Sequence, residues 1–219
     1  KASWKVGIQL GDKLIERYIE DEGKIPQNIA MLVYGGETMK TNGDDIAEAL
    51  YLMGVRPIWL NNGDRVIGLE VIPYEELKRP RIDVTLRITG LFRDTFPILI
   101  RLLEEAVNLV SQLDEPEEIN YIRKNMNEEI EQLLKEGYKL SEAEHVSKMR
   151  VFGCPPGTYG AGVGVLINSK EWETREDLGK AYINWSSYAY GKSYHGTKAE
   201  KIFTKRMSKS EITVKNESS

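Results

Sequence analysis

Cysteine occurs only once in this chain, at Cys154, and histidine only twice, at His145 and His195. A single cysteine excludes an intrachain disulfide framework and favours a reducing compartment, so we expect a cytoplasmic protein. Two histidines are too few for a typical structural zinc site. No apolar run approaches the ~18 residues of a membrane span, and the N-terminus lacks the apolar core of a signal peptide. Because the chain also lacks an initiator methionine, we expect it to be processed or excised from a longer polypeptide.

Several catalytic and binding signatures are missing as well. The glycine-rich segment at residues 153–164 has no following Gly-Lys-Ser/Thr, so it is not a P-loop. It also has Val165 where a dinucleotide-binding fingerprint requires its third glycine. Neither a Ser-His-Asp arrangement nor a metal-ligand spacing can be assembled from the sequence. The net charge of −4 does not indicate the basic surface that a nucleic-acid-binding protein presents.

Strand-like and helix-like segments alternate in the first half of the chain. Apolar runs at residues 29–34 and 55–59 and the alternating segment 82–88 predict strands, whereas helical periodicity appears at 10–19, 46–53 and 96–110. After residue 116 the helical pattern dominates, at residues 119–133 and 178–189. The order predicts an α/β fold, with a mostly parallel sheet and flanking helices in the first half and a largely helical second half. We expect two segments, 1–115 and 116–219, that both belong to a much larger chain.

The segment at residues 35–45 lies between a predicted strand and a predicted helix, and contains Glu37, Thr38 and Lys40. In open α/β sheets ligands favour that edge, and helix N-termini attract anions. Its three glycines permit a close approach of the backbone to a ligand. A surface turn in front of a capped helix is the alternative interpretation.

Two further segments carry candidate binding residues. Arg87, Arg93 and Asp94 flank a strand-to-helix turn, and arginine forks grip carboxylates. An Arg–Asp pair that only locks the turn explains the same residues. The aromatic residues between positions 185 and 194 are able to line a flat apolar pocket, and core packing is the alternative. His195 follows them and is of a type that titrates near neutral pH or binds metal.

An ordered series of short segments carries a family resemblance: Tyr34–Gly43, Met53–Pro57, Leu69–Pro73, Arg79–Thr85, Leu91–Asp94, Asp114–Pro116, Arg123–Lys124, Gly157–Gly160 and Tyr188–Gly191. Together they resemble the large subunit of the cobaltochelatase and magnesium chelatase family, over nearly the whole chain. The loop at residues 156–162 and the segment at 188–191 look like the cobalt form. The magnesium branch usually has a serine-rich loop at the first of these places.

The resemblance implies an internal fragment of a subunit that binds the tetrapyrrole and the metal ion. It implies that Co²⁺, as substrate, enters a corrin-pathway precursor in cobalamin biosynthesis, and that separate AAA+ motor subunits hydrolyse ATP. One alternative is a magnesium chelatase that inserts Mg²⁺ into protoporphyrin IX. A non-catalytic tetrapyrrole-binding or scaffold module and a free-standing α/β enzyme of unrelated chemistry are further alternatives. We expect the isolated fragment to be inactive.

The resemblance also suggests roles for individual residues. Insertion must remove two protons from the pyrrole nitrogens, and a carboxylate or a histidine is able to take them. Glu37 and His195 are therefore the catalytic candidates. The candidates for substrate binding are Thr38, Lys40, Arg87, Arg93, Asp94, Tyr159 and Tyr190. Metal ligands cannot be assigned, and we expect neither a nucleic-acid partner nor a membrane span.

Overall fold

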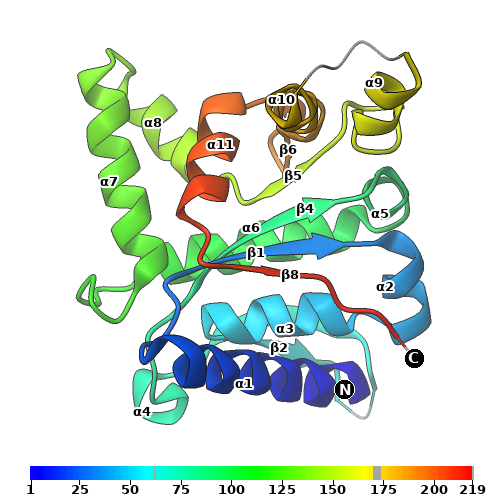
Figure 1. Cartoon of the computed structure of the whole chain (residues 1–219). Helices are drawn as coiled ribbons and strands as arrows, with labels where there is room; N and C mark the ends of the chain where they lie inside the picture. The colour runs from blue at the N-terminus through cyan, green and yellow to red at the C-terminus, as the bar shows by residue number, and fades with distance from the viewer. Residues whose placement is uncertain (62, 170–173, 219) are drawn as a thin grey trace.

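The computed structural model describes residues 1–61, 63–169 and 174–218, and its α/β fold is built on one mostly parallel sheet (Figure 1). The strand order is β7-β6-β5-β4-β1-β8. Strands β8, β1, β4 and β5 are parallel to one another, whereas β6 pairs antiparallel with both β5 and β7. The strands span Asn28–Val33 (β1), Asp83–Ile88 (β4), Val151–Gly153 (β5), Tyr188–Tyr190 (β6), His195–Lys198 (β7) and Ile212–Val214 (β8). A separate antiparallel hairpin pairs β2 (Val55–Trp59) with β3 (Val66–Val71).

The helices begin and end at residues suited to those positions. Gly23 ends the first helix in the left-handed conformation, Pro97 stands in the first turn of the sixth, and Thr174 caps the tenth. The described helices are α1 (Ala2–Glu22), α2 (Gly35–Thr41), α3 (Asp44–Met53), α4 (Tyr74–Leu77), α5 (Gly90–Thr95), α6 (Pro97–Ser111), α7 (Tyr121–Lys135), α8 (Leu140–Ser147), α9 (Val163–Ser169), α10 (Arg175–Ser186) and α11 (Glu200–Lys209).

The two faces of the sheet differ in chemistry because side chains alternate along each strand. On one face, alternate residues of β1 and β4, from Ile29 to Val33 and from Val84 to Ile88, join the main apolar core with α3 and α6. On the other face, Asp83, Thr85 and Arg87 are also buried. Asp83 accepts a hydrogen bond from Asn125 of α7, and Arg87 donates one to Ser186 of α10. Both faces are therefore covered, as is usual for parallel strands.

A smaller core lies between α7, α8, α10 and α11 and includes Phe152 of β5 and Ala189 of β6. Figure 1 shows α10 and α11 on the opposite side of the sheet from α1 and α3. Most of the described residues after position 116 that form regular structure are helical, and this part of the chain also supplies β5, β6, β7 and β8. The expected boundary between segments 1–115 and 116–219 lies within residues 114–117, between α6 and α7, and strands from both sides of it share one sheet. The division into two segments stays a prediction.

Two local expectations are wrong. The segment at residues 35–45 is predicted to connect a strand to a helix. Its first part instead forms the short helix α2, which ends where Asn42 and Gly43 adopt left-handed conformations. The helical pattern predicted to reach residue 189 ends at Ser186, where Tyr188–Tyr190 pairs with β5 and β7 instead. In both places contacts with neighbouring elements override the local pattern.

Candidate functional site

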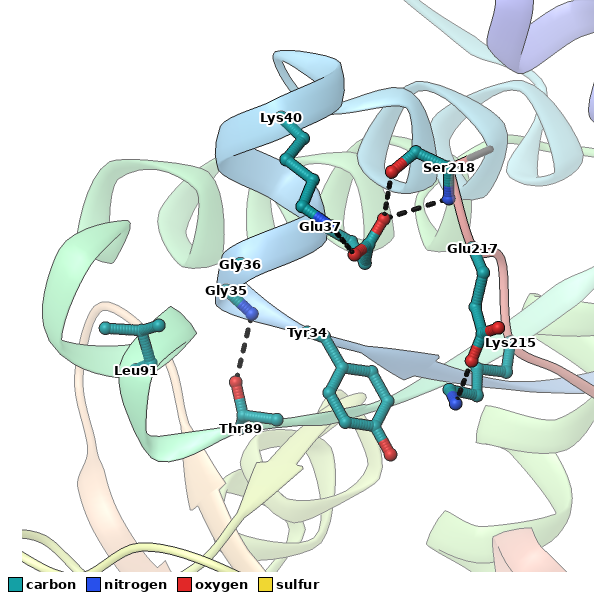
Figure 2. Close-up of a pocket in the computed structure, with 10 residues that line it drawn as sticks. All are labelled: Tyr34, Gly35, Gly36, Glu37, Lys40, Thr89, Leu91, Lys215, Glu217 and Ser218. Carbon is teal, nitrogen blue, oxygen red and sulfur yellow. Dashed lines mark hydrogen bonds and ion pairs between the residues drawn. The ribbon is translucent and has the colours of Figure 1, made fainter.

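Three neighbouring parallel strands, β4, β1 and β8, end at the same edge of the sheet, and the segments that follow them surround a hollow of about 480 Å³ (Figure 2). Strand β1 lies between β4, which comes next in this sheet along the chain, and β8, which comes last, so the strand order reverses at β1. Open α/β sheets bind ligands outside the carboxyl ends of strands at such a switch point. The residues that line the hollow are Tyr34, Gly35, Gly36, Glu37, Lys40, Thr89, Leu91, Lys215, Glu217 and Ser218.

Thr89 ties together the two short helices at this edge. Its backbone N–H donates to the carbonyl oxygen of Val33 at 3.0 Å, which continues the pairing of β4 with β1. Its hydroxyl accepts from the N–H of Gly35 at 3.1 Å and from the N–H of Phe92 at 3.3 Å. One side chain therefore satisfies amide groups at the start of both α2 and α5 and fixes the floor of the hollow.

Glu37 lies in the first turn of α2 and has three donors around its carboxylate. Lys40 Nζ donates to Oε1 at 2.8 Å, while the backbone N–H and the hydroxyl of Ser218 donate to Oε2 at 2.9 and 2.6 Å. The bond from Lys40, followed by those from Ser218, lowers the pKa of Glu37 to about 2. Glu37 is therefore ionised at neutral pH and is a weak proton acceptor while these donors remain.

Thr38 and Lys40 point in different directions from the same helix. The Thr38 side chain is buried, and its hydroxyl donates to the carbonyl oxygen of Tyr34 at 3.1 Å, so it does not line the hollow. The Lys40 side chain is 64% exposed and reaches the hollow, with Glu37 as its ion-pair partner. Only Lys40 of these two predicted binding residues is placed to meet a ligand in this hollow.

Arg93 and Asp94 form a two-pronged ion pair on α5. Arg93 Nε and Nη2 donate to the two carboxylate oxygens of Asp94 at 2.6 and 2.9 Å. Arg93 Nη1 donates to the carbonyl oxygens of Pro155 and Thr158 at 2.9 and 3.1 Å. The bond from Arg93 lowers the pKa of Asp94, and a second bond, from the hydroxyl of Tyr159 at 2.8 Å, lowers it further. Every guanidinium nitrogen of the buried Arg93 thus has a protein acceptor, and the pair holds the glycine-rich loop against α5.

Arg87 and Tyr190 hold other parts of the same loop. Arg87 is buried and donates to the carbonyl oxygen of Gly160 at 2.8 Å and to the hydroxyl of Ser186 at 3.3 Å. Tyr190 is 1% exposed, and its hydroxyl donates to the carbonyl oxygen of Cys154. These intramolecular contacts match the packing alternative for the aromatic cluster around Tyr190.

Most of the predicted residues fall into two groups. Arg93, Asp94, Tyr159 and Tyr190 gather at the loop, and His195 joins them with its ring centroid 5.1 Å from that of Tyr190. Glu37 and Lys40 lie in the hollow. The two groups meet at α5, because Leu91 lines the hollow while the backbone at Gly90 packs against Tyr159.

Sequence reasoning missed the wall that follows β8. Lys215, Glu217 and Ser218 line the hollow, and Asn216 Nδ2 donates to Asp45 Oδ1 at 2.8 Å and to Glu48 Oε2 at 2.6 Å. The available signal was the β-branched character of residues 212–214, since such residues favour strands. Three residues are too few to predict a strand or the edge at which it ends.

Neither a metal cluster nor a membrane span is evident in the part of the chain that the structure describes. Within residues 1–61, 63–169 and 174–218, no three His, Cys, Asp or Glu side chains gather closely enough to hold a metal ion. Over the same ranges no helix is both long and apolar enough to cross a membrane.

Comparison with known proteins gives consistent matches. The model of the family described as CobN/Magnesium Chelatase matches residues 1–219. The aerobic cobaltochelatase subunit CobN of Pseudomonas aeruginosa is 42% identical over 215 residues, 98% of this chain and 17% of that protein. The chloroplastic magnesium-chelatase subunit ChlH of Oryza sativa subsp. japonica is 38% identical over 180 residues, 82% of this chain and 12% of that protein.

A solved structure resembles the whole fold. The catalytic subunit of cobaltochelatase from Mycobacterium tuberculosis superposes with a TM-score of 0.91 at 40% identity, covering 99% of this chain and 18% of that one. The chain thus spans less than a fifth of the length of each of these relatives.

Proposed function

The chain belongs to the CobN/magnesium chelatase family, and from this premise we propose that it is part of the large, tetrapyrrole-binding subunit of a cobaltochelatase. The family match over the full length of the chain carries the proposal. The cobaltochelatase relatives, at 42% and 40% identity, support the cobalt branch. In the intact subunit the substrates are Co²⁺ and a metal-free corrin precursor of cobalamin. The magnesium relative keeps Mg²⁺ and protoporphyrin IX as the alternative pair.

The hollow at the sheet edge combines apolar and charged side chains, as the binding of a tetrapyrrole with acid substituents requires. Tyr34 and Leu91 line the hollow and are 39% and 44% exposed, and they offer apolar contact to a flat ring system. Glu37 and Lys40 supply charges of both signs. A macrocycle with acid substituents is able to lie on the apolar wall with one acid group near Lys40.

Metal insertion replaces two N–H protons of the macrocycle by one divalent cation, so it releases two protons. We propose that ionised Glu37 attracts and briefly holds the incoming cation, since carboxylate oxygen is a common ligand of divalent metals. Its proton-accepting role then begins when Lys40 and Ser218 release it, because their bonds keep its pKa near 2. His195 is the second proton-acceptor candidate, and its side chain is exposed beside Tyr190.

The remaining predicted residues divide by accessibility. Tyr159 is 63% exposed and Asp94 is partly exposed, so both are free to touch substrate. Thr38, Arg87, Arg93 and Tyr190 are buried with intramolecular partners, and we assign them the positioning of α2, α5 and the loop at residues 154–162.

Energy for the reaction comes, in this proposal, from ATP hydrolysed by separate AAA+ motor subunits. The lack of a Walker motif in this chain supports that division of labour. A cytoplasmic location agrees with the single cysteine.

The test is a cobalt-insertion assay with the full-length subunit, its motor partners, ATP and a metal-free corrin precursor. We expect Glu37→Gln to lower the insertion rate at least tenfold, on the scale of a lost proton-transfer or ion-binding group, with little change in melting temperature. Glu131→Gln is the matched control, because it also removes a helix-surface pair, with Lys135 at 2.6 Å. Unchanged insertion by Glu37→Gln would exclude its role.

The same assay separates the alternatives. Faster insertion of Mg²⁺ into protoporphyrin than of Co²⁺ into the corrin precursor would support the magnesium branch. Tetrapyrrole binding without insertion of either metal, in the complete complex, would support the scaffold alternative.

A further inference from the structure

Lys215 comes to the hollow through the pairing of β8 with β1. Ile212, Thr213 and Val214 lie opposite Ile29, Ala30 and Met31 in parallel register, so the chain emerges from both strands at the same edge. Lys215 is the first residue after β8, as Tyr34 is the first after β1. The Lys215 ammonium nitrogen lies 5.1 Å from the centroid of the Tyr34 ring (Figure 2). An apolar surface and a cation are thus adjacent on one wall.

Two lysines, Lys40 and Lys215, line the hollow from different elements. Each has one glutamate partner: Lys40 pairs with Glu37 and Lys215 with Glu217. Both lysine side chains are well exposed, at 64% and 43%, and ion pairs at such positions contribute little to stability. Either ammonium group is therefore available to a ligand.

Neither glutamate depends on its lysine. Glu37 keeps the two bonds from Ser218 when Lys40 turns away. The Glu217 side chain is 68% exposed, so water is able to replace Lys215. A ligand carboxylate inside the hollow meets a charge-assisted donor, and such bonds are stronger than neutral ones.

We propose that Lys215 is a carboxylate-binding residue of this hollow, so that a flat ligand resting on Tyr34 has one acid substituent held by Lys215 and another by Lys40. The inference rests on the proposed function and deepens it, because it selects macrocycles that carry free acid groups on separate sides. It also makes the segment after β8 part of the substrate site.

Contacts other than that of Lys215 hold the segment after β8 in position, so a substitution of Lys215 tests its charge alone. Asn216 donates to Asp45 and Glu48, and Ser218 donates to Glu37. Lys215→Gln therefore removes the cation and leaves the wall. Lys198→Gln is the matched control, since Lys198 is similarly exposed at 47% and pairs with Glu200 outside the hollow.

The experiment is an absorbance titration of the full-length subunit with four metal-free probes: a corrin precursor, protoporphyrin IX, and the methyl esters of both. We expect the wild type and Lys198→Gln to prefer free acids over esters by at least tenfold in Kd. Lys215→Gln should weaken binding of the preferred free acid about tenfold and leave ester binding unchanged.

Three results would count against the proposal. Equal weakening of acid and ester would mean that Lys215 acts only through the shape of the wall. No weakening of either would mean that it does not touch the ligand. In both cases the proposed function survives, whereas a wild type that binds none of the four probes would overturn both.

Discussion

Asp45 and Glu48 lie one turn apart on α3 and face the segment that follows β8. Their side chains are 3% and 1% exposed, and the amide group of Asn216 donates to both carboxylates. Burial raises the pKa of Glu48 to about 7 and also raises that of Asp45, and the negative charges of Asp44 and Glu37 raise the Asp45 value further. At neutral pH this pair holds a proton in a substantial fraction of molecules.

Glu48→Gln is expected to remove a pH-dependent penalty on folding. An unfolded Glu48 loses its proton near its ordinary pKa of 4.5, whereas the folded form keeps it up to about 7. The Glu48 contribution to stability therefore falls as pH rises from 4.5 to 7 and is level above that. Relative to wild type, the variant should gain about 1–3 kcal/mol between pH 5 and pH 8.

Urea unfolding at pH 5 and pH 8 measures this gain. Glu20→Gln, a change of the same charge on the exposed surface of α1, should show no such gain. A constant difference between Glu48→Gln and wild type at the two pH values would contradict the assignment.

The approach of α2 to α5 is an element-scale feature that depends on one missing side chain. A Cβ added at Gly35 would lie 2.7 Å from the backbone nitrogen of Phe92 and 2.9 Å from the side chain of Leu91. A Cβ added at Gly36 would meet nothing within 4 Å. The two adjacent glycines therefore differ in surroundings. Gly35 permits the close contact between α2 and α5, whereas Gly36 faces open space at the lining of the hollow.

Gly35→Ala should lower the free energy of unfolding by about 1–3 kcal/mol, because the added methyl group overlaps backbone that cannot move freely. Gly36→Ala should be neutral or stabilising by up to about 1 kcal/mol, since alanine favours helix over glycine. Urea denaturation of both variants beside wild type gives the comparison. If both substitutions changed the free energy of unfolding equally, the close approach of α2 to α5 at Gly35 would be contradicted.

At the scale of the whole molecule, a buried charge network joins the parts of the chain before and after residues 114–117. Asp83 of β4 accepts from Arg150 Nε at 2.6 Å and lies 3.6 Å from Arg206 Nη1 of α11. Arg206 Nη2 donates in turn to Glu129 of α7 at 2.8 Å. Burial alone would raise the pKa of Asp83, but Arg150 and Arg206 outweigh it and lower the pKa.

Asp83→Asn should cost about 3–5 kcal/mol of folding free energy, because it leaves two buried guanidinium groups with one carboxylate fewer. Asp64→Asn, at a side chain that is 82% exposed, is the control and should change stability little. Urea unfolding followed by circular dichroism should show one transition that moves to lower urea. Two separate transitions would instead support segments 1–115 and 116–219 as independent units.

Long elements with a strong pattern were predictable from the sequence alone. The strand predicted at residues 29–34 and the helical patterns at 46–53 and 96–110 agree with β1, α3 and α6 to within about two residues. The alternation in β4 predicted its apolar face, and the motif order supplied the family resemblance. Each of these signals is local, because it repeats over enough residues to be read without knowing the neighbours.

Tertiary structure decided which of the candidate residues meet. Strands β5, β6 and β8 have three residues each, and they are strands only because a partner strand satisfies their backbone groups. The return of β8 beside β1 brings Lys215 to Tyr34, across 180 positions of sequence that no local pattern spans. Folding likewise brings Arg87, Arg93 and Tyr190 to the carbonyl oxygens of the loop, which belong to residues distant in the chain. Sequence determined the family and the main elements, and packing determined the composition of the hollow.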